Sequence, residues 1–242
     1  MILTLCTAEE ALQLMLSADG QILEFSSQSS AGRMNETMAP AVASMLERHG
    51  DTPATPRLSA VTCVRGPGSF TGVRLGLAFA TGLCLARRIP LAGLDYLPLL
   101  AASAPGGFDE VHVVTHSRAN KVYHQSFAPP ATLTKPRDLT LKEALSIITP
   151  RVSKARVALL GSGLSRNRDA FAPLGTTVTL LPIENPTPEA LAAASQTARY
   201  DGPSVEALYL RGSDAEENLA AIALGRGLTE DEARARMDRA LR

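Results

Sequence analysis

Two histidines with the spacing of metal ligands, His112 and His116, are the first residues whose types suggest chemistry. On a helix, an HxxxH spacing places both imidazoles on one face, where they can share a zinc ion. Residues 111–115 (VHVVT) instead have the composition of a strand, in which four residues span about 13 Å. Two imidazoles that far apart cannot both reach one zinc ion at about 2 Å. With no HExxH motif and no third ligand, the sequence predicts no metal site.

A glycine-rich loop, residues 66–69 (GPGS), is the second candidate, because a loop of this kind before a helix can cradle a phosphate. It matches neither GxGxxG nor GxxxxGK[ST], and Arg65 and Arg74 are the only cations close to it. Gly66 and Gly68 are therefore secondary candidates for binding a nucleotide. Ser69 and Thr71 are predicted to cap the helix, since no His–Asp pair accompanies them to make a nucleophile.

The helix that must follow this loop, from about residue 69 to residue 88, is unusual for its glycines. Gly72, Gly76 and Ala80 are four residues apart and share one helix face, and Gly82 adds a further glycine. Each glycine inside a helix costs about 1 kcal/mol relative to alanine, so three cost roughly 3 kcal/mol. Close approach of another backbone would offset this cost. That backbone belongs either to this chain's own sheet or to another chain.

The elements around this helix alternate between strands and helices, which indicates the α/β class. Short apolar runs predict strands at residues 2–5, 12–16, 22–25, 58–64, 89–94, 111–115, 122–127, 157–160 and 178–181, with a hairpin turn at Asp19-Gly20 and a polar loop at residues 26–32. A helix over residues 35–49 carries Met34, Met38, Val42, Met45 and Leu46 on one side, and Pro40 should kink it or delay its start. A capping box at Thr140–Glu143 predicts a further helix, and residues 188–200 form another. The break at residues 105–107 (PGG) divides the chain into residues 1–104, 105–212 and a charged helical tail, 213–242.

Composition limits the classes of function. The chain has 24 Lys and Arg against 24 Asp and Glu, so its net charge is zero, and a concentrated basic face for gripping RNA alone is not expected. Cys6, Cys63 and Cys84 lie in apolar stretches, as reduced buried thiols do. No signal peptide and no apolar stretch long enough for a membrane span is present, so the expected location is the cytoplasm.

At residues 64–74 (VRGPGSFTGVR) the sequence resembles the TsaB (YeaZ) family, whose signature is a strand, GPGSFTGVR and a helix. Weaker agreement extends from Ile2 to about Arg211 and includes the opening hairpin, the helix with Pro40, residues 89–93, Arg118, Val122-Tyr123 and residues 209–211. The tail after Ser213 has no counterpart. The resemblance implies a two-lobed actin-like ATPase fold (ASKHA, of the sugar kinase and Hsp70 type).

In function, the resemblance implies a non-catalytic subunit that binds and activates the TsaD-type threonylcarbamoyltransferase. The complex, which a TsaE-type ATPase joins, forms N6-threonylcarbamoyladenosine at position 37 of tRNAs that read codons starting with A; this chain would meet tRNA only indirectly, and no membrane. It is expected to bind no cofactor alone, although ATP or ADP is compatible with the assembled complex. The partner-binding residues implied by the family, on the methionine helix and the glycine helix, are Met34, Met38, Val42, Met45, Ser69, Thr71, Gly72, Val73, Gly76, Phe79 and Ala80. A homodimer through the same helices is an open alternative when the partner is absent.

Four departures from the family pattern bear on nucleotide chemistry. Cys6 stands where the family usually has an aspartate, and Met34 where it has a histidine; His116 and Lys121 replace acidic residues. These changes argue against independent nucleotide chemistry. Arg118 is kept and is a further secondary candidate for a nucleotide contact. The alternative function is a self-sufficient small-molecule kinase or ATPase of the actin-like superfamily, which would need a carboxylate near the phosphates.

Overall fold

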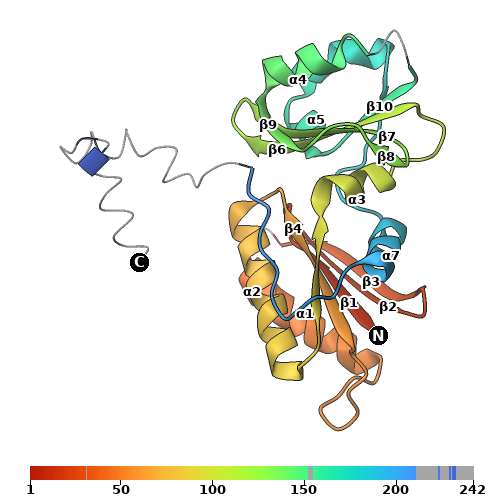
Figure 1. Ribbon diagram of the computed structural model, residues 1–242, viewed down its shortest axis with the longest axis vertical. Helices are drawn as coiled ribbons and strands as arrows, with labels where there is room; N and C mark the ends of the chain where they lie inside the picture. Colours follow the sequence, from red (N-terminus) through yellow and green to blue (C-terminus); the bar gives the residue numbers. More distant parts are fainter. Residues whose placement is uncertain (31, 152–154, 211–222, 224–228, 230, 233–242) are drawn as a thin grey trace. The chain divides into compact units, whose positions relative to one another are not determined.

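The computed structural model describes residues 1–30, 32–151, 155–210, 223, 229 and 231–232 of the chain. Met1–Leu208 form one compact unit and Tyr209–Arg242 belong to another (Figure 1). Most of the predicted tail and Arg211 lie outside the described residues. Within the tail, Thr229 and Glu232 hydrogen-bond to each other.

The first sheet has the strand order β3-β2-β1-β4-β5. Its strands are β1 (Ile2–Cys6), β2 (Ala11–Ala18), β3 (Gln21–Ser29), β4 (Ala60–Gly66) and β5 (Leu91–Asp95). β1, β2 and β3 pair antiparallel, whereas β4 pairs parallel with both β1 and β5. Asp19 and Gly20 both have positive φ (47° and 81°), as a two-residue hairpin turn requires, and this predicted turn is confirmed.

Four helices accompany this sheet. α2 (Phe70–Arg87) packs on β1, β4 and β5, and α1 (Met34–Arg48) packs beside it on β2. α7 (Pro188–Thr197) packs on β1, β2, β3 and β5, and the short α3 (Tyr96–Ala102) contacts strands of both sheets (Figure 1). α1 and α2 are therefore neighbours, which makes them one continuous surface.

The second sheet repeats the plan of the first. Its strands are β6 (Glu110–Arg118), β7 (Lys121–Ala128), β8 (Ala131–Thr132), β9 (Arg137–Thr140), β10 (Val157–Leu160) and β11 (Thr179–Leu180), in the order β11-β10-β6-β7-β8 with β9 also on β7. As in the first sheet, an antiparallel hairpin adjoins parallel strands. α4 (Leu141–Ile148), α5 (Ser162–Arg166), α6 (Arg168–Phe171) and a 3₁₀ turn (Ala172–Thr176) accompany this sheet, and Val114, Leu159 and Phe171 lie in its aliphatic core. We call the two sheets, each with its helices, the first and second lobes.

The predicted α/β class and two-lobed actin-like fold are confirmed, with local corrections. Residues 26–29 were predicted as loop but continue β3, because a strand at the sheet edge tolerates polar side chains on its exposed face. Pro40 does not delay α1, which already begins at Met34. β9, with only four residues, was not predicted. The division at residue 104 stays a prediction. No helix in the described ranges is both long and apolar enough to span a bilayer.

Candidate partner-binding site

The glycine face of α2 packs against the turn between β1 and β2. Ser69 caps the helix by accepting a hydrogen bond from the Gly72 N–H (3.2 Å), as predicted. A Cβ atom on Gly72 would lie under 3.0 Å from the Thr7 carbonyl oxygen, and one on Gly76 would be equally close to the Thr7 hydroxyl. A Cβ atom on Gly68 would likewise lie under 3.0 Å from the Ala8 carbonyl oxygen. The close approach that these glycines permit is therefore made inside this chain.

Most of the residues expected to bind a partner are buried within this chain, and only a few are exposed. Met34, Met38, Val42 and Met45 of α1 are at most 7% exposed, and on α2 Gly72, Val73, Gly76 and Ala80 are also buried. Phe79 is partly buried, whereas Ser69 and Thr71 are exposed. The buried residues lie on the helix faces that pack against the first sheet. The faces of α1 and α2 that are accessible to another chain are the opposite ones.

These opposite faces consist largely of small residues. On α2 the exposed stripe is Thr71, Arg74, Ala78, Gly82 and Leu85, and on α1 it is Glu36, Ala39, Pro40, Ala43 and Glu47. The Arg74 guanidinium lies over the Phe70 ring, 3.7 Å from its centroid. A Cβ on Gly82 would have no atom within 4 Å, so nothing in the described part of this chain explains a glycine there. We call these two stripes the helix-pair surface.

The GPGS loop uses its backbone within the chain. Gly66 has φ 110°, and a Cβ there would lie under 3.0 Å from the Leu208 carbonyl oxygen. The Ser69 N–H donates to the Ala8 carbonyl (2.7 Å) and the Leu208 N–H to the Arg65 carbonyl (2.7 Å). The Arg65 side chain pairs with Asp95 at 2.6 Å. This packing accounts for both Gly66 and Gly68 without a phosphate.

A cleft of about 190 Å³ lies where the β1–β2 turn faces α5. Its lining residues are Glu9, Glu10, Ala11, Ser29, Ser162, Arg166, Glu184 and Asn185, so Gly66, Gly68 and Arg118 do not line it. Here three carboxylates line the cleft and its one cation, Arg166, pairs with Glu10 at 2.5 Å. Because phosphate oxygens carry negative charge, these residues do not fit a nucleoside phosphate.

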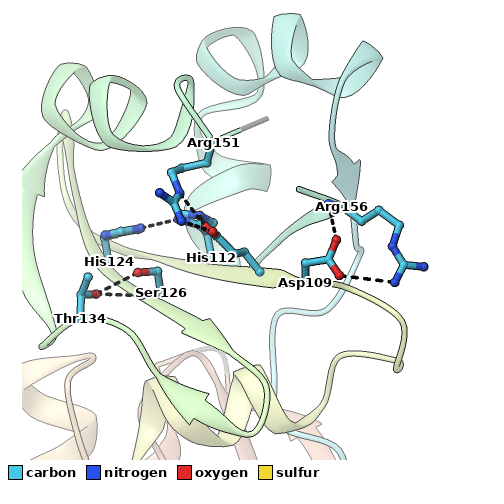
Figure 2. Close-up of polar contacts among 8 residues, drawn as sticks. Asp109, His112, His124, Ser126, Thr134, Arg151 and Arg156 are labelled. Carbon is cyan, nitrogen blue, oxygen red and sulfur yellow. Dashed lines mark hydrogen bonds and ion pairs between the residues drawn. The ribbon is translucent and has the colours of Figure 1, made fainter. Parts of the chain in front are cut away.

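His112 pairs with a different histidine from the one that its spacing suggested. Its Nδ1 lies 3.0 Å from Nε2 of His124 on β7, and the two rings stack with centroids 5.3 Å apart (Figure 2). On its other side His112 approaches Glu110, which the Arg151 guanidinium holds in an ion pair. His116 is on the same strand but lies near Ser162 and Arg166. Among the described residues, no group of three or more His, Cys, Asp and Glu could hold a metal ion.

The histidine pair predicts that the protein loses stability in acid. Burial lowers the pKa of His112 and lowers the pKa of His124 to about 4, from 6.5. Between pH 6.5 and 4 the unfolded chain thus binds a proton at His124 that the folded chain excludes. The free energy of unfolding should fall by about 1–2 kcal/mol from pH 6.5 to pH 5 through this residue alone. Because other groups also titrate in this range, the loss is measured as the difference in urea unfolding between the wild type and a variant without this histidine.

His124→Gln isolates the effect, because glutamine keeps a polar side chain but does not titrate. It should lose less stability than the wild type on going from pH 6.5 to 5. Equal pH dependence in His124→Gln and the wild type would show that the pair does not exclude protons.

Comparisons with known proteins agree on one family. The model of TsaD, tRNA N6-adenosine threonylcarbamoyltransferase, matches residues 28–146. The tRNA threonylcarbamoyladenosine biosynthesis protein TsaB of Escherichia coli K12 is 33% identical over 124 residues, 50% of this chain and 52% of that protein. An uncharacterised protein of Mycobacterium tuberculosis H37Rv is 30% identical over 162 residues, 66% of this chain and 67% of that protein. The chain belongs to the TsaB (YeaZ) family.

A solved TsaB-family structure shares the fold. YeaZ from Pseudomonas aeruginosa superposes with a TM-score of 0.68 at 22% identity, covering 86% of this chain and 99% of that one. The sequence match is shorter, since it spans about half the length of E. coli TsaB. The matched residues 28–146 include both α1 and α2, and therefore the whole helix-pair surface.

Two features of the site were missed by sequence reasoning. The exposed pair Ala78 and Gly82 was not predicted, because the spacing of Gly72 and Gly76 indicates only the buried face of the helix. Their four-residue spacing on the other face was a usable signal. The hydrogen bond from the Ser162 hydroxyl to Glu9 (2.6 Å) had no signal in the sequence, because the two residues are 153 positions apart.

Proposed function

We propose that this chain is a non-catalytic subunit in the formation of N6-threonylcarbamoyladenosine, the pathway stated in the names of its TsaB relatives. In this proposal it binds and activates a TsaD-type threonylcarbamoyltransferase, which modifies adenosine 37 of tRNAs reading codons that start with A. A TsaE-type ATPase joins the assembly, and tRNA is met through the partner. Without the partner, two copies of the chain pair through the same surface.

The observation that carries the proposal is Gly82. It lies inside α2 on the exposed side, where a glycine costs about 1 kcal/mol relative to alanine and open space would admit a Cβ. Ala78 precedes it by one turn, and Ala39 and Ala43 have the same spacing on the neighbouring α1. Small residues at this spacing let a helix of another chain approach closely, with its side chains between these positions.

Two further observations support a role without chemistry of its own. The cleft between the lobes is lined by three carboxylates and does not suit a nucleotide. The thiol of Cys6, where the family usually has an aspartate, is buried, and burial raises its pKa to about 12. A thiol that stays protonated replaces neither a metal-binding carboxylate nor a nucleophile. We therefore expect no nucleotide turnover by this chain alone.

Gly82→Leu tests the proposal, because it fills the helix-pair surface without touching this chain's interior. Its affinity for the cognate TsaD-type subunit, measured by calorimetry, should fall by at least about 100-fold, as for loss of an interface hot spot. Its unfolding midpoint should equal or exceed that of the wild type, since leucine favours a helix more than glycine. The control is Gly106→Leu, which also enters open space but lies before the second sheet, and should bind like the wild type.

Wild-type affinity in Gly82→Leu would reject the helix-pair surface as the contact. The absence of any complex between the wild-type chain and the TsaD-type subunit would reject the proposed function itself. Threonylcarbamoylation of tRNA by the mixed subunits supplies the second measurement. It should decrease with the affinity of the complex and be restored at high concentrations of Gly82→Leu.

A further inference from the structure

An apolar cavity of about 350 Å³ lies where α3 and the linker after it (residues 103–109) meet the second sheet. Its floor is a row of three residues that face one another across adjacent strands: Val111 of β6, Phe127 of β7 and Thr132 of β8. Residues opposite each other on neighbouring strands share one face of a sheet, so these side chains form a continuous surface. Val111 and Phe127 are also buried. The floor is therefore built from the second sheet itself.

The walls of the cavity come from segments with small or rigid side chains. One wall is the last turn of α3, with Ala101 and Ala102, together with the linker. The other is the β7–β8 turn, Pro129-Pro130, whose rings carry no N–H that could donate to a ligand. Because α3 contacts both β6 and β7, the first wall is already held against the floor. The cavity is thus formed before any ligand enters.

No charged side chain lines this cavity. Of its thirteen described lining residues, Thr132 alone has a polar side chain, and the other twelve are Pro, Ala, Gly, Phe and Val. Burying an unpaired charge against such a surface is costly. An occupant must therefore be uncharged and mainly apolar. The Thr132 hydroxyl can accept one hydrogen bond from it.

The volume of the cavity sets the size of the occupant. An apolar cavity of about 150 Å³ admits benzene, so this one has room for roughly two such rings. A phenylalanine side chain inserted by another protein would leave about half of the space empty. Small-molecule pockets in proteins begin at about 300 Å³. The size therefore favours a small molecule over a single inserted side chain.

Gly106, in the linker wall, keeps the cavity open. A Cβ atom there would have no atom within 4 Å, and the backbone of Gly106 does not have the positive φ of its neighbour Gly107. Neither crowding nor conformation within the described part of this chain thus calls for glycine at position 106. A larger side chain at this position would take up space that the ligand needs.

We propose that this cavity binds a small uncharged molecule of about two rings, aromatic or alicyclic. The proposal goes beyond the proposed function and does not depend on it, since no lining residue belongs to α1 or α2. The ligand would contact α3 and the second sheet at the same time. It would bind only the folded chain and so stabilise the junction of the two lobes.

The probe for this site is 1-naphthol, an uncharged molecule of two fused rings with one hydroxyl. In an NMR titration of the full chain it should bind with a dissociation constant of about 1 mM or tighter. Nuclear Overhauser effects from its ring protons should reach the methyl groups of Val111 and Thr132. Naphthalene-1-sulfonate has the same rings with a negative charge, and it should bind at least about 10-fold more weakly.

Two substitutions that fill the cavity from different sides test the location. Ala102→Phe, at an exposed position of α3, and Thr132→Phe, at an exposed strand position where aromatic residues are favoured, should each weaken 1-naphthol binding by at least about 10-fold. The control is Ala193→Phe, the same change at an exposed alanine of α7 outside the lining, and it should bind 1-naphthol like the wild type. Urea unfolding of all three variants checks that each is folded.

Four results would each overturn the proposal. The first is no binding of 1-naphthol by the wild type at several times the expected dissociation constant. The second is wild-type affinity in a folded Ala102→Phe or Thr132→Phe chain. The third is Overhauser contacts to Leu85 of the helix-pair surface in place of Val111. Equal affinity for naphthalene-1-sulfonate is the fourth, because it would show that the site does not select an uncharged ligand.

Discussion

Gly72→Ala is expected to lower the free energy of unfolding by about 2–4 kcal/mol, although alanine is the better helix former. The added Cβ would lie under 3.0 Å from the Thr7 carbonyl oxygen, a distance that real Cβ atoms do not show. A backbone oxygen in a turn cannot move aside as a flexible side chain can. The β1–β2 turn or the first turn of α2 must therefore shift, and the Ser69 cap that bonds the Gly72 N–H would shift with it.

Gly82→Ala on the same helix is the matched control and should have the opposite sign. Its Cβ enters open space, so the variant should gain about 0.5–1 kcal/mol from helix propensity alone. Urea unfolding followed by circular dichroism at 25 °C measures both changes. If both variants were stabilised alike, the glycine face of α2 would not be packed against the β1–β2 turn.

The contrast between these glycines shows what their spacing in the sequence could predict and what it could not. The spacing of Gly72 and Gly76 correctly predicted that their helix face packs closely against a backbone. It left open whether that backbone belonged to this chain or to another, because helix periodicity defines a face but not its neighbour. The neighbour proved to be Thr7, more than sixty residues earlier in the chain.

The fold was more predictable than the site for the same physical reason. Hydrophobic patterning and the Asp19-Gly20 turn are local signals, and they located the strands of both sheets within a few residues, except the short β8 and β9. The cleft depends on side chains such as Glu9 and Ser162, which only the packing of the two lobes brings together. Strand pairing likewise decides the neighbours of His112. Its ring lies beside His124 on β7 and not beside His116, whose spacing is typical of a metal site.

The β1–β2 turn contacts both the glycine face of α2 and the second lobe. Its Thr7 and Ala8 contact the buried face of α2, and its Glu9 contacts the second lobe. The opposite face of α2 belongs to the helix-pair surface. A partner that shifts α2 would therefore also act on the turn that contacts the second lobe.

Asp51→Ala is expected to have the largest effect on stability, a loss of about 3–5 kcal/mol. The Asp51 side chain is completely buried just after α1. One carboxylate oxygen accepts the backbone N–H groups of Arg57 and Leu58, and the other lies 3.0 Å from the guanidinium of Arg87, in the last turn of α2. Alanine would leave the buried Leu58 N–H and the partly buried Arg87 without these partners, and unpaired groups of this kind carry the full cost of desolvation.

Asp51→Asn is the matched variant, because its amide oxygen can still accept from the backbone while the charge opposite Arg87 is lost. It should lose only about 1–2 kcal/mol in the same urea titration. Asp51→Ala should also weaken binding of the TsaD-type subunit, since the Asp51–Arg87 pair ties the end of α1 to the end of α2 and so fixes the helix-pair surface. A loss below 1 kcal/mol in Asp51→Ala would mean that neither the loop nor the two helix ends depend on this carboxylate. If Asp51→Ala lost the full expected stability but kept its affinity for the TsaD-type subunit, Asp51 would stabilise the loop without fixing the geometry of the helix-pair surface.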